Sequence, residues 1–189
     1  MTDLHSYDYY IIAFSGGKDC TACFLNLLEK GVPVDKVELW HHLVDGRESM
    51  NESMDTPFTL MDWECTEDYC RKFACHFGVK IYYSWLRRGF YGEMMRDNEP
   101  TEITIWEMPG PDGKTIYSSA GGDGPSGSRL KFPQVSPDLS VRWCSGYLKI
   151  EVMRKAIVNQ PRFYGAKVLI ISGERAEESA ARASYCDFE

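Results

Sequence analysis

The sequence predicts an α/β protein with a Rossmann-like open parallel sheet and helices on both faces. Three observations support this prediction: short apolar runs typical of buried strands, segments between them in which apolar residues recur at helical spacing, and a glycine-rich turn between the first strand and the first helix. The chain has 189 residues, enough for one substantial core. We therefore expect a single domain over residues 1–189.

The first strand and helix have the clearest patterns. Tyr9–Phe14 is almost wholly apolar, which is typical of a strand buried on both faces. After Ser15-Gly16-Gly17, apolar residues recur at helical spacing until the helix stop at Lys30-Gly31. Lys36–Val44 is predicted to be the second strand, closed by Asp45-Gly46.

A second helix and a third strand follow. Apolar residues mark one side of a helix from Phe58 to Phe77, and Gly78 provides its stop. The next run, Val79–Leu86, has the composition of a strand.

We expect a hairpin and loop insertion at about residues 87–138. Within it, Thr101–Met108 and Lys114–Ser119 flank a turn rich in proline and glycine, the pattern of a hairpin. Gly121–Ser128 is the part richest in glycine, and we predict a mobile loop there. Closure of this loop over a bound nucleotide is a hypothesis.

The last elements return to the α/β alternation. A helix is predicted from Val141 to about Asn159, and the apolar run Lys167–Ser172 is predicted to be a strand. Gly173 then leads into a predicted helix at Glu174–Ala183.

Composition narrows the class of protein. No apolar run approaches the roughly 20 residues that cross a bilayer, and the start lacks a secretory signal, so we expect a cytoplasmic protein without a membrane partner. The net charge of −7 and the scattered Lys and Arg argue against nucleic acid as the main ligand, although a local basic patch stays possible. Seven cysteines cannot all pair within the chain, and we expect reduced thiols.

Ser15-Gly16-Gly17-Lys18-Asp19 has the features of a phosphate-binding loop. Glycines let a ligand approach the backbone, and the first amides of the following helix have no partner within the helix. Lys18 adds a full positive charge, and Asp19 is a candidate either to hold Mg²⁺ or to cap the helix. The loop is not a Walker A motif, because Ile12 stands where that motif needs glycine. The alternative is an ordinary tight turn with a solvated Lys18.

The segment from Phe14 to Cys20 resembles the SGGKDS signature of the PP-loop ATP pyrophosphatases. The resemblance implies an adenine nucleotide alpha hydrolase-like fold, phosphate binding by Ser15 to Cys20, and chemistry between the α and β phosphates. Cys20 replaces the usual final serine, so we expect weaker phosphate contact there.

Two later segments are similar to motifs of the phosphoadenosine phosphosulfate (PAPS) reductase branch. Arg142–Ile150 resembles Arg-x-Cys-x-x-x-x-Lys, and Gly173–Arg182 resembles Gly-x-Arg-x-x-Glu-Ser-x-x-Arg. The resemblance implies that Arg142, Lys149, Gly173 and Arg175 help to bind an anionic nucleotide, with Lys18 and Arg175 as the catalytic candidates. The alternatives are a solvated basic helix face and a surface arginine paired with a nearby glutamate.

Asp45-Gly46 lies where this family has an Asp-Thr-Gly-like segment near the nucleoside, but the middle residue is missing. The C-terminal Glu-Cys-Gly-Leu-His tail with the family's reductive cysteine is also missing. The chain stops soon after the Gly-x-Arg motif, so we expect a short form or a chain without a substrate-binding tail. Cys65, Cys70 and Cys75 point to three sides of one helix, and we expect no iron–sulfur cluster. His41 and His42 face opposite ways on a strand.

Three functions stay open. The first is a PAPS reductase-like enzyme of sulfur metabolism, of oxidoreductase or transferase type, that binds ATP or a sulfonucleotide. The second is an ATP pyrophosphatase that transfers AMP to an acceptor, with nucleic acid as one candidate acceptor. The third is a nucleotide-binding module without its own catalysis, acting with a protein partner or as a homodimer. Mg²⁺ is expected with the nucleotide.

Overall fold

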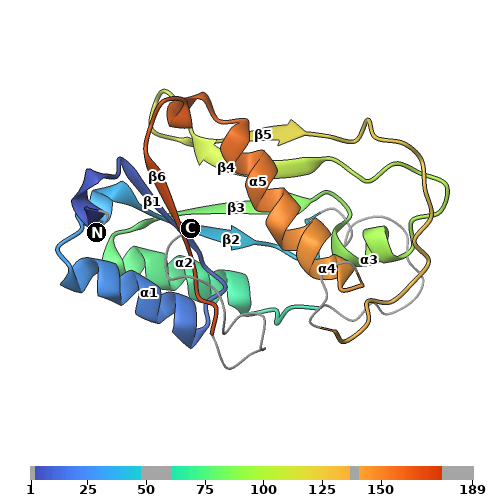
Figure 1. Cartoon of the computed structure of the whole chain (residues 1–189), viewed down its shortest axis with the longest axis horizontal. Coiled ribbons are helices and arrows are strands. Elements are labelled where there is room, and N and C mark those ends of the chain that lie inside the picture. Colours follow the sequence, from blue (N-terminus) through green and yellow to red (C-terminus); the bar gives the residue numbers. More distant parts are fainter. Residues whose placement is uncertain (1–2, 48–60, 137–140, 176–189) are drawn as a thin grey trace.

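One six-stranded sheet organises the part of the chain that the computed structural model describes, which is residues 3–47, 61–136 and 141–175. The strand order is β5-β4-β3-β2-β1-β6 (Figure 1). The strands are β1 (Tyr9–Ala13), β2 (Val37–His42), β3 (Lys80–Leu86), β4 (Thr104–Pro109), β5 (Thr115–Ala120) and β6 (Val168–Ser172). The predicted α/β class is confirmed, and the predicted strands all form within a few residues of their expected bounds.

The sheet is mixed rather than wholly parallel. β1, β2, β3 and β6 run parallel, whereas β4 pairs antiparallel with both β3 and β5. The difference has a simple cause: β4 and β5 are joined by the expected hairpin turn, and a short turn can join only antiparallel strands. The insertion at 87–138 thus extends the sheet, and it adds one short helix, α3 (Gly89–Met94).

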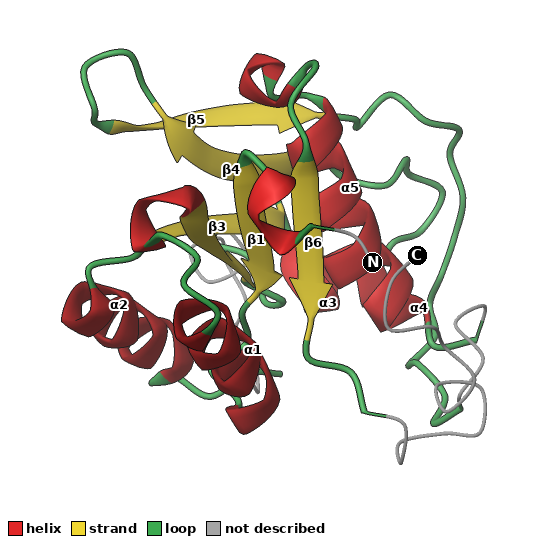
Figure 2. Cartoon of the chain, turned by 60° about the vertical axis from the view of Figure 1, so that its left-hand side comes forward, coloured by secondary structure: helices red, strands yellow, loops and turns green. Residues whose placement is uncertain are grey.

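Helices cover both faces of the sheet, as Figure 2 shows. α1 (Lys18–Glu29) and α2 (Thr66–Phe77) pack on one face, against Ile12, Phe14 and Leu39. α5 (Glu151–Val158) packs on the other face, where the core contains Ile11, Trp40, Tyr82 and Trp106. The alternation of neighbouring β1 and β2 residues between two cores explains why β1 is apolar throughout and why Val37, Leu39 and Trp40 of β2 are all buried.

The second helix begins later than the apolar spacing predicts. It starts at Thr66, because the Asp62 carboxylate accepts hydrogen bonds from the Trp63 amide and the Thr66 hydroxyl, both at 2.8 Å, and holds a turn. Phe58 lies outside the described residues. The helix ends as predicted at Gly78, which is left-handed with φ of 64°.

The helix predicted at 141–159 is interrupted by a π-helical turn. α4 (Trp143–Ser145) is followed by the π turn Gly146–Ile150, and α5 continues from Glu151. Of the helix predicted at Glu174–Ala183, the described residues Glu174 and Arg175 are not helical, and the remainder lies outside the described residues. Short 3₁₀ helices lie at Leu4–Ser6, Val34–Lys36 and Pro161–Phe163.

The glycine-rich segment 121–128 is attached to the insertion at its C-terminal end. The Gly127 amide donates to the Glu99 carbonyl at 3.0 Å, and the Arg96 guanidinium donates to the Gly127 carbonyl at 2.6 Å. The Ser128 hydroxyl donates to the Asp97 carboxylate at 2.6 Å. These bonds restrict the end of a segment for which the glycine content predicted mobility.

Candidate nucleotide site

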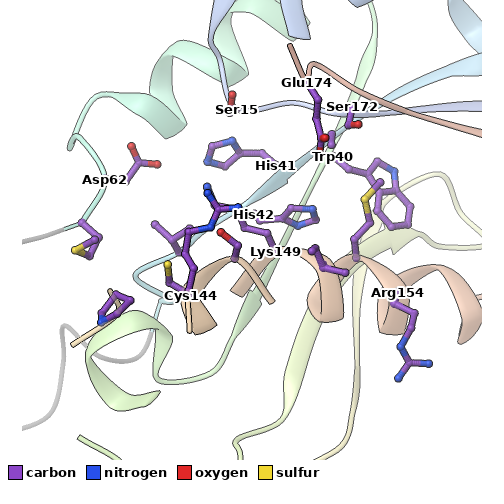
Figure 3. Close-up of a pocket in the computed structure, with 18 of the residues that line it drawn as sticks. Ser15, Trp40, His41, His42, Asp62, Cys144, Lys149, Arg154, Ser172 and Glu174 are labelled. Carbon is purple, nitrogen blue, oxygen red and sulfur yellow. The ribbon is translucent and has the colours of Figure 1, made fainter. Parts of the chain in front are cut away.

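A cavity of about 1410 Å³ opens at the carboxyl edge of the parallel strands. Its walls come from the ends of β1, β2 and β6 on one side and from the α4–α5 segment on the other (Figure 3). Residues 132–136 of the insertion, and Val44, Met61 and Asp62, also line it. The cavity therefore lies where open parallel sheets bind ligands.

The loop between β1 and α1 has the geometry that an anion site needs. Gly16 has a φ of 81°, and a Cβ on it would lie 3.1 Å from the Tyr69 ring. Gly17 caps α1 and has no side chain, so the first amides of the helix donate no hydrogen bond to a capping side chain. Ser15 lines the cavity, while the Lys18 side chain is exposed at the helix start.

The end of β6 packs directly on the first turn of α1. A Cβ on Gly173 would lie 2.7 Å from the Cys20 nitrogen and 2.9 Å from the Asp19 carbonyl carbon, so only glycine fits without a shift. The following Arg175 reaches back to this turn, with its Nε 3.3 Å from Asp19 Oδ2. Gly173 and Arg175 thus lie beside the loop, as their position after a strand predicted.

Cys20 faces the inside of the loop. Its side chain is buried, its Sγ donates to the Gly17 carbonyl at 3.1 Å, and the Ser15 hydroxyl lies 3.7 Å away. The thiol therefore closes the loop from within, on the side of the hydrophobic core.

Arg142 and Lys149 both line the cavity, opposite the loop. Arg142 is the N-cap of α4 and Lys149 lies on the π turn, so the irregular helix brings both cations to one wall. Trp143, which follows Arg142 in the sequence, is buried and stacks on Phe90 with ring centroids 5.2 Å apart. This contact holds α4 in place.

Asp45 and Gly46 lie behind the cavity wall that Met61 and Asp62 form. The buried Asp45 carboxylate accepts hydrogen bonds from the Met61 and Asp62 amides, at 3.0 Å each for the shortest contacts. Gly46 is left-handed, and a Cβ on it would lie 2.7 Å from the Arg87 carbonyl oxygen. In this structure the pair supports the segment that lines the cavity, and it does not itself line the cavity.

Sequence reasoning missed the position of the two histidines, which end β2 and both line the cavity. His41 Nδ1 lies 2.8 Å from the Phe14 carbonyl, and His42 Nδ1 lies 2.8 Å from the Ser84 hydroxyl. Burial lowers the pKa of His41, and it lowers the pKa of His42 to about 3. The cause is the loss of water around each ring, which disfavours the charged imidazolium. Both rings are therefore neutral near pH 7. A pair of polar residues at the carboxyl end of an apolar strand was the available signal.

Among the described residues, no group of three or more His, Cys, Asp or Glu side chains is arranged to hold a metal ion. The six cysteines in that part of the chain are free thiols. Cys70 is buried, whereas Cys65 and Cys75 are exposed, in keeping with their different directions. No helix in the described ranges is long and apolar enough to span a bilayer.

Comparisons of the chain with protein-family models, with curated proteins and with solved structures return no match.

Proposed function

We propose that the chain binds an adenine nucleotide, either ATP or a PAPS-type sulfonucleotide, in this cavity. In the proposal the phosphates lie at Ser15–Asp19 and the reaction takes place at the α–β phosphate or phosphosulfate linkage. The observation that carries the proposal is that three separate segments meet at one cavity. Ser15 of the loop, Ser172 and Glu174 on either side of Gly173, and the two cations of the opposite wall line it, and the uncapped start of α1 follows Ser15.

Charge supports an anionic ligand. The protein as a whole has a net charge of −7, yet Arg142 and Lys149 lie in the cavity lining and Lys18 lies at the loop. Together with the first amides of α1, these groups would stabilise negative charge that develops on a phosphate during bond cleavage. Lys18 and Arg175 are the catalytic candidates in this proposal.

Asp19 is the residue that would hold Mg²⁺. Mg²⁺ at a nucleotide needs only one or two protein carboxylates, because phosphates and water supply its other ligands. One carboxylate at the helix start meets this requirement, although Asp19 is also the ion-pair partner of Arg175. In the proposal Mg²⁺ supplies neutralisation of phosphate charge.

The cavity size favours a second candidate, transfer of AMP from ATP to an acceptor. Small-molecule sites are usually roughly 300–1,000 Å³, and this cavity exceeds that range. Apolar side chains of α5 and β6, including Met153, Ile157 and Ile170, line part of it, so the nucleotide would leave space for a second molecule.

Ligand-dependent thermal unfolding tests the proposal. Wild type, Lys18→Ala, Arg142→Ala and Lys149→Ala are heated with ATP–Mg²⁺, PAPS, adenylylsulfate and GTP. A ligand at about 100 times its dissociation constant stabilises the folded state by roughly 2.7 kcal/mol, which shifts the midpoint by several degrees. Lys114→Ala is the matched control, because Lys114 is exposed in the hairpin turn and remote from the cavity.

We expect a shift with an adenine nucleotide that the three site variants reduce and Lys114→Ala preserves. The ligand with the largest shift distinguishes the ATP and sulfonucleotide forms of the proposal. Pyrophosphate release from ATP would favour AMP transfer, and a thiol-dependent sulfite product would favour reduction. The proposal is wrong if no adenine nucleotide shifts the midpoint, or if the shift is the same in all variants.

A further inference from the structure

His41 occupies an unusual place between the sheet and the phosphate loop. It is 2% exposed, and it extends from the carboxyl end of β2 towards neighbouring β1. Its Nδ1 lies 2.8 Å from the carbonyl oxygen of Phe14, the residue directly before Ser15. Because Phe14 directly precedes the loop, a hydrogen bond to its carbonyl restrains the backbone at the point where the loop begins.

The contact determines the tautomer of the ring. A carbonyl oxygen can only accept a hydrogen bond, so Nδ1 carries the hydrogen. Burial keeps the pKa of His41 below its ordinary value, so the second nitrogen, Nε2, carries no hydrogen near pH 7. Nε2 is buried and has no hydrogen-bond partner among the described residues.

Cys70 joins His41 to the loop from the side of α2. Its Sγ lies 3.6 Å from His41 Nδ1 and would lie 3.2 Å from a Cβ on Gly16. The loop backbone is therefore held between a donor from β2 and a sulfur from α2, close to the residue whose left-handed conformation forms the turn.

We propose that His41 is a positioning residue of the phosphate loop: its Nδ1–H holds the Phe14 carbonyl and so fixes the direction in which Ser15 and Gly16 leave β1. It acts on the ligand through the loop and does not touch the phosphates. This inference rests on the proposed function for its consequence in nucleotide binding, but the tautomer and the hydrogen bond belong to the protein without ligand.

The first test needs no nucleotide. Nitrogen-15 NMR of the histidine rings at pH 7.5, with His41 assigned by the His41→Asn variant, distinguishes the two neutral tautomers. We expect hydrogen on Nδ1 and none on Nε2. Hydrogen on Nε2 would overturn the proposal whether or not the protein binds nucleotides.

The second test uses two amides as replacements for the two ring nitrogens. The amide nitrogen of asparagine is attached to Cγ, like Nδ1, whereas that of glutamine lies one bond further, near the place of Nε2. We expect His41→Asn to bind the nucleotide nearly as well as wild type and His41→Gln and His41→Leu to bind about tenfold more weakly. All variants are compared at a temperature at which each is fully folded.

The Ser15 and Gly16 amide shifts are recorded in the same variants without ligand. We expect them to stay near the wild-type values in His41→Asn and to move in His41→Gln. Equal affinity and equal amide shifts in the asparagine and glutamine variants would contradict the proposal, and so would a glutamine variant that binds better than the asparagine variant. If wild type binds no nucleotide, the proposed function fails, and the tautomer and amide shifts still decide the role of His41.

Discussion

At the scale of single residues, the two histidines show how position decides chemistry. His41 and His42 are neighbours on β2, yet one donates to the backbone before the phosphate loop and the other contacts Ser84 on β3. Both are held neutral, because burial disfavours the charged imidazolium.

The low pKa of His42 predicts a loss of stability in mild acid. Below pH 6.5 the unfolded chain binds a proton at His42, whereas the folded chain, with a pKa of about 3, does not. The unfolded state then binds more protons, so stability falls as the pH falls, by up to about 1.4 kcal/mol per pH unit for one histidine.

Urea unfolding of wild type and His42→Asn at pH 7.5, 6.0 and 5.0 measures this effect. We expect the difference in stability between the two proteins to shrink as the pH falls, because the variant has no proton to bind at this position. A difference that is constant over this range would contradict the prediction.

Gly173 provides a steric prediction. A methyl group there would overlap the Cys20 nitrogen, which belongs to the backbone of α1 and cannot turn aside. We expect Gly173→Ala to destabilise the protein by about 1–3 kcal/mol and to weaken nucleotide binding, because β6 and α1 must separate. Gly124→Ala is the control: Gly124 has nothing within 4 Å of an added Cβ, and we expect a change within about 0.5 kcal/mol.

Both variants are compared in urea unfolding and in nucleotide titration. A Gly173→Ala protein as stable as wild type would contradict the prediction. It would show that the end of β6 can move away from α1 without a loss of stability.

At the scale of elements, α3 anchors the insertion through one buried carboxylate. Glu93 on α3 is 1% exposed, and it binds Arg96 Nε at 3.1 Å and Arg129 Nη2 at 2.8 Å. The Arg129 guanidinium also covers the rings of Trp143 and Tyr147, which flank the helix start that carries Arg142. The cluster therefore joins the insertion to the cationic wall of the cavity.

Removal of this carboxylate leaves two arginines without their buried partner. We expect Glu93→Ala to lower the free energy of unfolding by about 3–5 kcal/mol. Glu99→Ala removes a comparable carboxylate from an exposed ion pair with Arg88, and we expect a loss of at most about 1 kcal/mol. Thermal and urea unfolding measure both variants, and similar losses would show that the Glu93 cluster is no more important than a surface pair.

The elements that the sequence predicted well are those with local patterns. The apolar run of β1, the glycine turn, the helical spacing of α1 and the hairpin turn each depend on residues close in the chain. The role of Asp45 depends on hydrogen bonds across 16 or 17 residues in the sequence, and the π turn has no simple periodicity. The start of α2 is set by a local turn at Asp62, which apolar spacing does not reveal. That residues 132–136 of the insertion line the cavity also could not be predicted, because it depends on the tertiary structure.

The candidate site follows the same division. Ser15–Lys18 could be recognised because strand, turn and helix are consecutive, and Gly173 because it follows a strand. The role of His41 was hidden, since its partner Phe14 is 27 residues away. Asp19 in the first turn of α1 and Arg175 after β6, proposed for separate roles, form an ion pair.

At the scale of the whole molecule, the cavity combines the edges of two regions of core. The face with α1 and α2 supports the phosphate loop, and the face with α5 supports the wall with Arg142 and Lys149. A change deep in either core can therefore alter the relative position of the two walls.

The pairing of β1 with β6 has a consequence for folding during protein synthesis. Tyr9 pairs with Val168, so β1 gains one of its two neighbouring strands only after roughly 150 further residues have been synthesised. The turn at Ser15–Lys18 exists early, but Gly173, which closes against it, comes roughly 150 residues later. Over that stretch of synthesis the nascent chain has an unfinished turn at Ser15–Lys18, and in the proposed function nucleotide binding must wait until β6 has formed.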